Sequence, residues 1–179
     1  NFQNESKFNF KHLFIIIKHI LSVSTLFNFK VLNTNNKNFS NTSYKKLIIS
    51  WAKKEDFMDD GSFYDSKFRV NSKENSNILW FLIYLDNSIP KKIDKNLIIF
   101  YKKKNIIKYN IYFFLKIIVK SIIQNRKSLF KILHEVSLQS QFAEIVTKNI
   151  KQIVIPNNFK SVIVPYESQP FQNNVFKEI

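Results

Sequence analysis

The chain contains no cysteine and only one glycine in 179 residues. Without cysteine it has no disulfide framework, no thiolate nucleophile and no cysteine-ligated metal site, which fits a reducing compartment. The single glycine, Gly61, excludes a glycine-rich phosphate loop, so the Walker and dinucleotide-binding fingerprints are absent. No signal peptide is recognisable, and Lys18 and His19 interrupt the apolar stretch of residues 12–29 before it reaches membrane-spanning length. We therefore expect a cytoplasmic protein, with peripheral contact at the inner membrane left open.

Basic charge dominates the composition, with a formal net charge of +15, yet it is a weak guide to function. The chain holds 26 lysines, 26 isoleucines and 22 asparagines, residues whose codons are rich in A and T. An AT-rich genome raises the lysine content without any polyanionic partner. Only Arg69 and Arg126 are arginine, the side chain best suited to bidentate phosphate contacts. Apolar residues make up 45% of the chain, which excludes a wholly disordered protein and suffices for one domain.

Short apolar runs bounded by turn-forming residues predict buried strands, although periodicity alone leaves buried helix segments open. These runs are residues 46–51, 78–85, 97–101 and 161–165. Residues 7–27 indicate a helix, or a strand with ragged flanks, because the β-branched run at 15–17 disfavours a helix. Helical spacing predicts helices over residues 109–124 and 126–152, and Pro170 suits the first turn of a further helix. Alternating strands and helices predict an open α/β sheet. We expect residues 1–44 to form an N-terminal helical or linker segment, with 28–44 as the linker, and residues 45–179 to form the α/β domain.

A loop over residues 53–73 concentrates acidic side chains just beyond the first predicted strand of the α/β domain. Its carboxylates are Glu55, Asp56, Asp59, Asp60 and Asp65. The carboxyl ends of strands are where open α/β sheets bind ligands, so Asp60 or Asp65 could serve as a base or a substrate anchor. The alternative is a solvated loop in which Asp60 and Gly61 form a turn. The spacing of the acids does not match a calcium-binding loop.

A second segment, residues 161–171, joins a predicted strand to the C-terminal helix. Glu167 lies near the positive end of that helix, which favours its ionised form, and it could accept hydrogen bonds from sugar or ribose hydroxyls. Gln169 could add hydrogen bonds from the same turn. A purely structural carboxylate is the alternative.

Other potential sites have weaker patterns. The three histidines, at positions 12, 19 and 134, lack the spacing of a zinc site, and no nucleophile elbow is present. Lysines at 102–104 and along 116–131 alternate with apolar residues. Such a face could contact anionic lipid or RNA, or could simply be solvated.

Two segments resemble one family. In residues 46–93 a strand ending in Ser50-Trp51 is followed by the Asp60-Gly61-Ser62 loop and an apolar strand containing tryptophan. This block resembles bacterial surface-carbohydrate and capsule biosynthesis proteins. Residues 163–177, which carry Tyr-Glu-Ser-Gln-Pro-Phe, are similar to a segment of the same proteins and of glycosyltransferases with two Rossmann-like domains.

The resemblance implies an open Rossmann-like, mostly parallel sheet flanked by helices. It implies a GT-B-like sugar transferase of surface polysaccharide synthesis, of which this chain is the N-terminal, acceptor-side part. The partners would be a nucleotide-sugar and a glycan or lipid-linked glycan acceptor. No cofactor is implied beyond that donor substrate, and nucleic acid is not expected.

The matched positions give the candidate site residues that the resemblance implies. Asp60 and Asp65 are the catalytic candidates. The substrate-binding candidates are Gly61, Ser62, Lys67, Arg69, Tyr166, Glu167 and Gln169. The family pattern has an arginine directly after the second aspartate, where this chain has Ser66, so Lys67 or Arg69 would supply the positive charge as a looser point contact.

Two hypotheses from other classes remain beside the transferase. A basic RNA-binding protein of the ribosomal type would gather Lys102–Lys104, Lys116, Lys120 and Lys131 on one surface and bind RNA in a salt-dependent way. A membrane-surface scaffold would instead place the helices of residues 109–131 on anionic lipid.

Overall fold

The computed structural model describes residues 29–33, 44–86, 88–102, 137–165 and 170–178, together with single residues at 11, 14, 15, 17, 18, 119 and 123. The chain forms two compact units, one of residues 1–28 with 106–146 and one of residues 29–105 with 147–179. The sheet belongs to the second unit, which carries the candidate site. The predicted helices over residues 7–27 and 109–124 lie largely outside the described residues.

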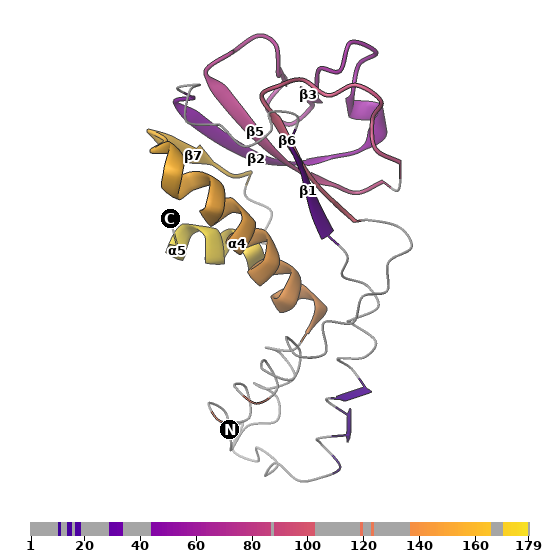
Figure 1. The fold of residues 1–179 in the computed structure, drawn as a ribbon, viewed down its shortest axis with the longest axis vertical. Helices are drawn as coiled ribbons and strands as arrows, with labels where there is room; N and C mark the ends of the chain where they lie inside the picture. Colours follow the sequence, from indigo (N-terminus) through magenta and orange to yellow (C-terminus); the bar gives the residue numbers. More distant parts are fainter. Residues whose placement is uncertain are drawn as a thin grey trace. The chain divides into compact units, whose positions relative to one another are not determined.

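The second unit is built on a mixed five-stranded sheet in the order β1-β6-β5-β2-β7 (Figure 1). Its strands are β1 (Phe29–Asn33), β2 (Lys46–Ala52), β5 (Ile78–Tyr84), β6 (Leu97–Lys102) and β7 (Ser161–Ile163). All neighbouring pairs are parallel except β1 with β6. The α/β class and all four predicted strands are confirmed, and the alternative of buried helix segments is excluded.

The β1 edge of the sheet differs from the sequence prediction. Residues 28–44 were expected to form a linker, but Phe29–Asn33 pairs antiparallel with β6. The Phe29 ring stacks on Phe100 with centroids 4.7 Å apart and planes 7° from parallel. This pairing depends on a partner about 70 residues later in the chain, so local composition does not reveal it.

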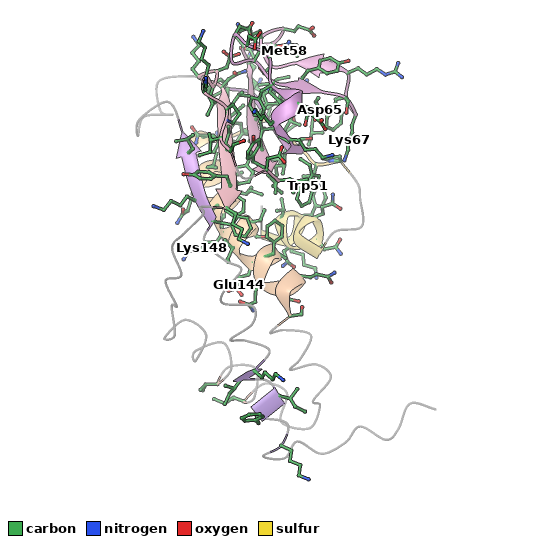
Figure 2. All side chains as sticks on the ribbon, turned by 90° about the vertical axis from the view of Figure 1, so that its right-hand side faces the viewer. Trp51, Met58, Asp65, Lys67, Glu144 and Lys148 are labelled. Carbon is green, nitrogen blue, oxygen red and sulfur yellow. The ribbon has the colours of Figure 1, made fainter. Side chains whose placement is uncertain are left out.

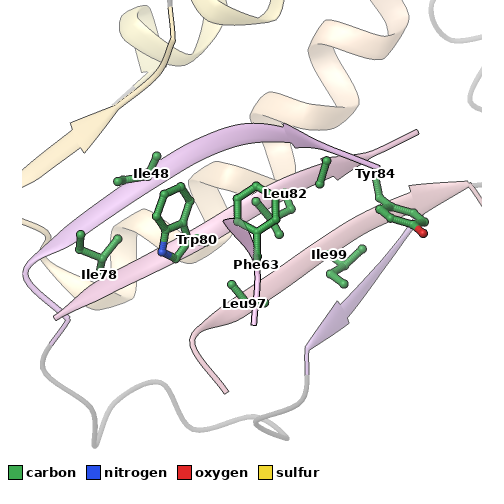
Figure 3. Packing of buried hydrophobic residues seen from close by; sticks show 9 residues of the cluster. Ile48, Phe63, Ile78, Trp80, Leu82, Tyr84, Leu97 and Ile99 are labelled. Carbon is green, nitrogen blue, oxygen red and sulfur yellow. The ribbon is translucent and has the colours of Figure 1, made fainter. Parts of the chain in front are cut away.

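The two faces of the sheet are covered by different kinds of structure. On one face an apolar cluster surrounds the fully buried Trp80, and Phe63 from the loop packs against it at 5.4 Å between ring centroids (Figure 3). On the other face, Phe81 stacks on Phe100 at 5.8 Å. The helices lie behind the sheet in Figure 3, so the loop and the helices cover opposite faces.

The crossovers from β2 to β5 and from β5 to β6 contain no α-helix among their described residues, and the first contains the loop predicted over residues 53–73. The first carries a short 3-10 helix, η2 (Lys54–Asp56), and a small hairpin of β3 (Tyr64–Asp65) and β4 (Val70–Asn71). A tight turn precedes that hairpin, since Gly61 N donates to Met58 O (2.9 Å) and Phe57 bridges to Phe63. Turn-forming residues without a 3.6-residue apolar period explain why no helix forms here.

Two helices follow in the last part of the chain. α4 (Leu138–Asn157) starts directly after Ser137, whose Oγ accepts a hydrogen bond from Ser140 N (3.3 Å). It ends where Pro156 removes a backbone donor and Asn158 adopts a φ of 46°. α4 therefore confirms the later part of the predicted 126–152 helix and extends beyond it; residues 126–136 lie outside the described residues. α5 (Pro170–Glu178) starts at Pro170, as predicted.

Candidate functional site

The order in which the parallel strands are added to the sheet reverses at β2. From β2 the chain moves to β5 and then β6 on one side, and it returns to place β7 on the other side. β7 pairs only with Lys46–Ile48, so the carboxyl half of β2 has no partner on that side among the described strands. In open α/β sheets, ligands bind beside the carboxyl ends of the two strands that flank such a reversal. The candidate site therefore lies where β2 and β7 end.

Of the predicted site residues that the structure describes, Asp65 lies beside β2, since it is hydrogen-bonded to Ser50. Asp60 and Gly61 lie elsewhere, against Lys73 and Asp94, which precede β5 and β6. Trp51 is the penultimate residue of β2, and side-chain alternation puts it on the face opposite Ser50. In Figure 2, Asp65 and Lys67 lie beside one another on the loop, and Trp51 lies nearer the helices. Tyr166, Glu167 and Gln169 follow β7 in the sequence but lie outside the described residues.

Asp65 holds the loop to β2. Its side chain is buried, with only 3% of the residue exposed. Ser50 Oγ donates to Asp65 Oδ2 at 2.5 Å, and the backbone N–H groups of Lys67 and Phe68 donate to Oδ1 at 2.8 and 2.9 Å. Three donors pair the two carboxylate oxygens, so the geometry gives Asp65 a structural role. Its predicted use as a base stays a prediction.

Asp60 lies at the turn that Gly61 closes, and its carboxylate is also paired. Oδ1 accepts hydrogen bonds from Ser62 N (2.9 Å) and Ser62 Oγ (2.7 Å), and Oδ2 meets Lys73 Nζ at 2.6 Å. The Lys73 ammonium and the Ser62 donors hold the pKa of Asp60 well below its usual range, and the same contact raises the pKa of Lys73. A carboxylate with a lowered pKa is a weak proton acceptor near neutral pH. The catalytic role of Asp60 stays a prediction, and its observed role is to hold the turn.

The neighbouring candidates of the loop differ in exposure. Gly61 is buried with a φ of 91°, and its carbonyl accepts a hydrogen bond from Asp94 N (3.0 Å). Ser62 is buried beside it. Lys67 and Arg69 are exposed, and Arg69 has a positive φ of 55°. Lys67 and Arg69 are thus exposed at the hairpin, while the carboxylates of Asp60 and Asp65 accept local hydrogen bonds.

A further polar group lies at the carboxyl ends of β2 and β5, and the sequence interpretation assigned it no role. Asp86 follows β5, and its Oδ2 accepts a hydrogen bond from Lys54 N (2.6 Å). Tyr84 donates its hydroxyl to Ser88 O (2.6 Å). Burial, then the negative charges of Asp86 and Asp56, raise the pKa of Tyr84 to about 12. The position of Asp86 directly after an apolar run was the available sequence signal, since strand ends carry ligand-binding side chains.

Within the described ranges, no three His, Cys, Asp or Glu side chains are grouped so that they could hold a metal ion. None of the helices in those ranges combines the length and apolarity that crossing a bilayer requires. Of the lysines in the RNA-binding hypothesis, only Lys102 belongs to the described residues.

No protein-family model matches the chain, and no curated protein or solved structure matches it either. The resemblance to surface-carbohydrate biosynthesis proteins therefore depends on the two matched segments alone.

Proposed function

We propose that this chain is the acceptor-side, Rossmann-like part of a longer glycosyltransferase of surface polysaccharide synthesis, and that a sugar substrate binds where β2 and β7 end. The reversal of strand order at β2 carries this proposal. The reversal supports a ligand position at the carboxyl edge, and the Tyr-Glu-Ser-Gln segment comes shortly after β7 in the sequence.

The chemistry of the proposed site depends on hydroxyl recognition. Glu167 would accept hydrogen bonds from sugar hydroxyls, because a carboxylate near a helix start stays ionised. Lys67 and Arg69 would attract the phosphates of a nucleotide-sugar as exposed point charges. In the transfer step a base would remove the proton of the acceptor hydroxyl as its oxygen bonds to the anomeric carbon of the donor sugar. The bond from that carbon to the nucleoside diphosphate would break, and the diphosphate would leave with the bonding electrons. Asp60 and Asp65 hold the loop that carries the two cations.

A fluorescence titration tests the proposal. The chain has two tryptophans, and Trp80 is fully buried in the sheet, so Trp80→Phe leaves Trp51 as the only indole, at the end of β2. We expect saturable changes in Trp51 emission when uridine or guanosine diphosphate sugars are added. Glu167→Gln should weaken binding, whereas Glu74→Gln, at an exposed loop position, should not.

Two results would contradict the proposal. One is an unchanged Trp51 emission with every nucleotide-sugar at millimolar concentration. The other is tight binding to RNA that weakens steeply with salt in the absence of any nucleotide-sugar binding, which would favour the basic RNA-binding alternative.

A further inference from the structure

The only glycine of the chain directly follows an aspartate, and this Asp60–Gly61 pair has a known chemical reactivity. Because glycine has no Cβ, its backbone nitrogen can approach the side-chain carboxyl carbon of the preceding aspartate. Attack at that carbon closes a cyclic imide, a succinimide, which water then opens. The pair lies at an exposed turn, where 54% of the Asp60 side chain is accessible to solvent. Water, the second reactant, therefore reaches the site.

The reaction consists of two balanced steps. In the first step, Gly61 N bonds to Asp60 Cγ, and the protonated carboxyl group loses one oxygen as water, which also carries away the proton of the nitrogen. In the second step, water adds to one of the two ring carbonyls and breaks the bond from that carbon to the nitrogen. Cleavage at Asp60 Cγ restores aspartate, whereas cleavage at Asp60 C leaves the main chain running through Cβ and Cγ, which is isoaspartate. Water is the only co-reactant.

The folded loop commits both reacting groups to other partners. Gly61 N donates to Met58 O at 2.9 Å, so this hydrogen bond must break before the nitrogen can attack. The Asp60 carboxylate accepts hydrogen bonds from Ser62 N and Ser62 Oγ and meets Lys73 Nζ at 2.6 Å. These donors favour the ionised carboxylate, whereas ring closure consumes the protonated form. Both effects slow the reaction while the loop stays folded.

The shape of the turn explains why the reactive pair is present at all. Gly61 has a φ of 91°, and its carbonyl accepts a hydrogen bond from Asp94 N at 3.0 Å. A Cβ at this position would lie 3.0 Å from Lys92 C and from Ile93 N. The turn therefore needs glycine after Asp60, and Asp60 in turn supplies the acceptor for the backbone of Ser62.

We propose that Asp60–Gly61 is a site of isoaspartate formation that the folded loop keeps unreactive, and that the contact of Asp60 with Lys73 contributes to this protection. Local opening of the loop would release both reacting groups together. Isoaspartate lengthens the main chain by one carbon, so the modified turn could not restore the hydrogen bonds that join Met58 to Gly61 and to Ser62. The reaction would thus turn a transient opening into a lasting defect of the loop. This inference does not depend on the proposed function.

Incubation of the full chain in water labelled with heavy oxygen tests the inference. Each passage through the succinimide places a labelled oxygen on residue 60, whether aspartate or isoaspartate forms. The protein is kept near neutral pH, either folded or in concentrated urea, and the peptide that contains residues 59–62 is then analysed by mass spectrometry. We expect label and isoaspartate to accumulate at least about tenfold more slowly in the folded protein, because reaction there requires the sparsely populated open loop.

A lysine variant measures the contribution of Lys73. Lys73→Met removes the ammonium group and should raise the labelling rate of the folded protein about two- to fivefold, the range expected for an exposed ion pair. The rate in urea should stay the same. Lys91→Met makes the same chemical change at another exposed lysine and should alter neither rate. Labelling of Asp65 reports general unfolding of the loop, so it should not change in Lys73→Met.

Three outcomes would overturn the inference. Equal labelling rates of residue 60 in the folded protein and in urea would show that the fold gives no protection. Label in urea that is confined to other residues would show that the pair is not reactive. An unchanged rate in folded Lys73→Met would overturn the role given to Lys73. None of these results depends on nucleotide-sugar binding, so this inference and the proposed function fail separately.

Discussion

Replacing Gly61 with alanine should destabilise the second unit through two separate effects. The residue has a φ of 91°, where an L-residue is strained by about 1–3 kcal/mol. A Cβ added there would lie 3.0 Å from Ile93 N, from Lys92 C and from Lys92 Cβ, and two of these are backbone atoms that cannot turn aside. Overpacking of this kind typically costs a further 1–3 kcal/mol.

The loss of chain freedom in the unfolded state offsets a small part of that cost, about 0.4–1 kcal/mol for Gly→Ala. We therefore expect Gly61→Ala to lower the free energy of unfolding by about 1–6 kcal/mol, a large share of the roughly 5–15 kcal/mol of a typical domain. Urea denaturation followed by tryptophan emission measures the change as a shift in midpoint at constant slope.

Asp59→Ala is the matched control, since Asp59 is exposed two residues away and should change stability by less than about 0.5 kcal/mol. If Gly61→Ala behaved like this control, the backbone conformation and the close approach to residues 92 and 93 would both be wrong.

Three further substitutions test the core, the loop anchor and the alkaline behaviour. Trp80→Ala should lower the free energy of unfolding by about 3–5 kcal/mol, and Trp80→Phe should lower it much less. Phenylalanine keeps most of the packing and removes an indole N–H that has no hydrogen-bond partner in the described part. Urea midpoints compare the two variants, and equal losses of stability would contradict the packing. Ser50→Ala should lower the free energy of unfolding by about 1–3 kcal/mol, because Asp65 Oδ2 stays buried without the Ser50 hydroxyl as donor. Ser66→Ala, at an exposed position, should leave stability unchanged. An unchanged stability of Ser50→Ala would refute the structural role of the Ser50–Asp65 hydrogen bond. Because the folded pKa of Tyr84 is about 12 and the unfolded value is about 10, the folded state binds the proton more tightly between these values, so stability should fall as pH rises from about 10 to 12. Tyr84→Phe should lose that part of the pH dependence, and identical thermal melts of both proteins across this window would exclude the effect.

The sheet was largely predictable because burial on both faces forces continuous apolar runs. Ile78–Tyr84 is buried along its whole length, and its run is bounded by Asn77 and Asp86. β1 was not predicted, because Phe29–Asn33 lies beside an asparagine-rich stretch and pairs with a strand far away in the sequence. Local patterns report burial and turns, but they do not report partners far apart in the chain.

The site was predictable only in its location. The carboxyl end of β2 followed from the apolar run, but the pairing of Asp65 with Ser50 across 15 positions depends on how the small hairpin folds back over the sheet.

The density of acids in the loop has a physical explanation that does not require catalysis. Where a parallel sheet usually has a crossover helix, this chain has a loop, and a loop must satisfy its backbone N–H groups in another way. Side chains do this at successive turns: Asp60 for Ser62 N, Asp65 for Lys67 N and Asn71 for Lys73 N. Aspartate and asparagine are the residues that accept hydrogen bonds from the backbone two positions on. The loop thus keeps a fixed shape without a helix, and that shape brings Phe63 onto Trp80 and Lys73 onto Asp60. The carboxylates that suggested chemistry in the sequence act first as the acceptors that let this loop cover the sheet.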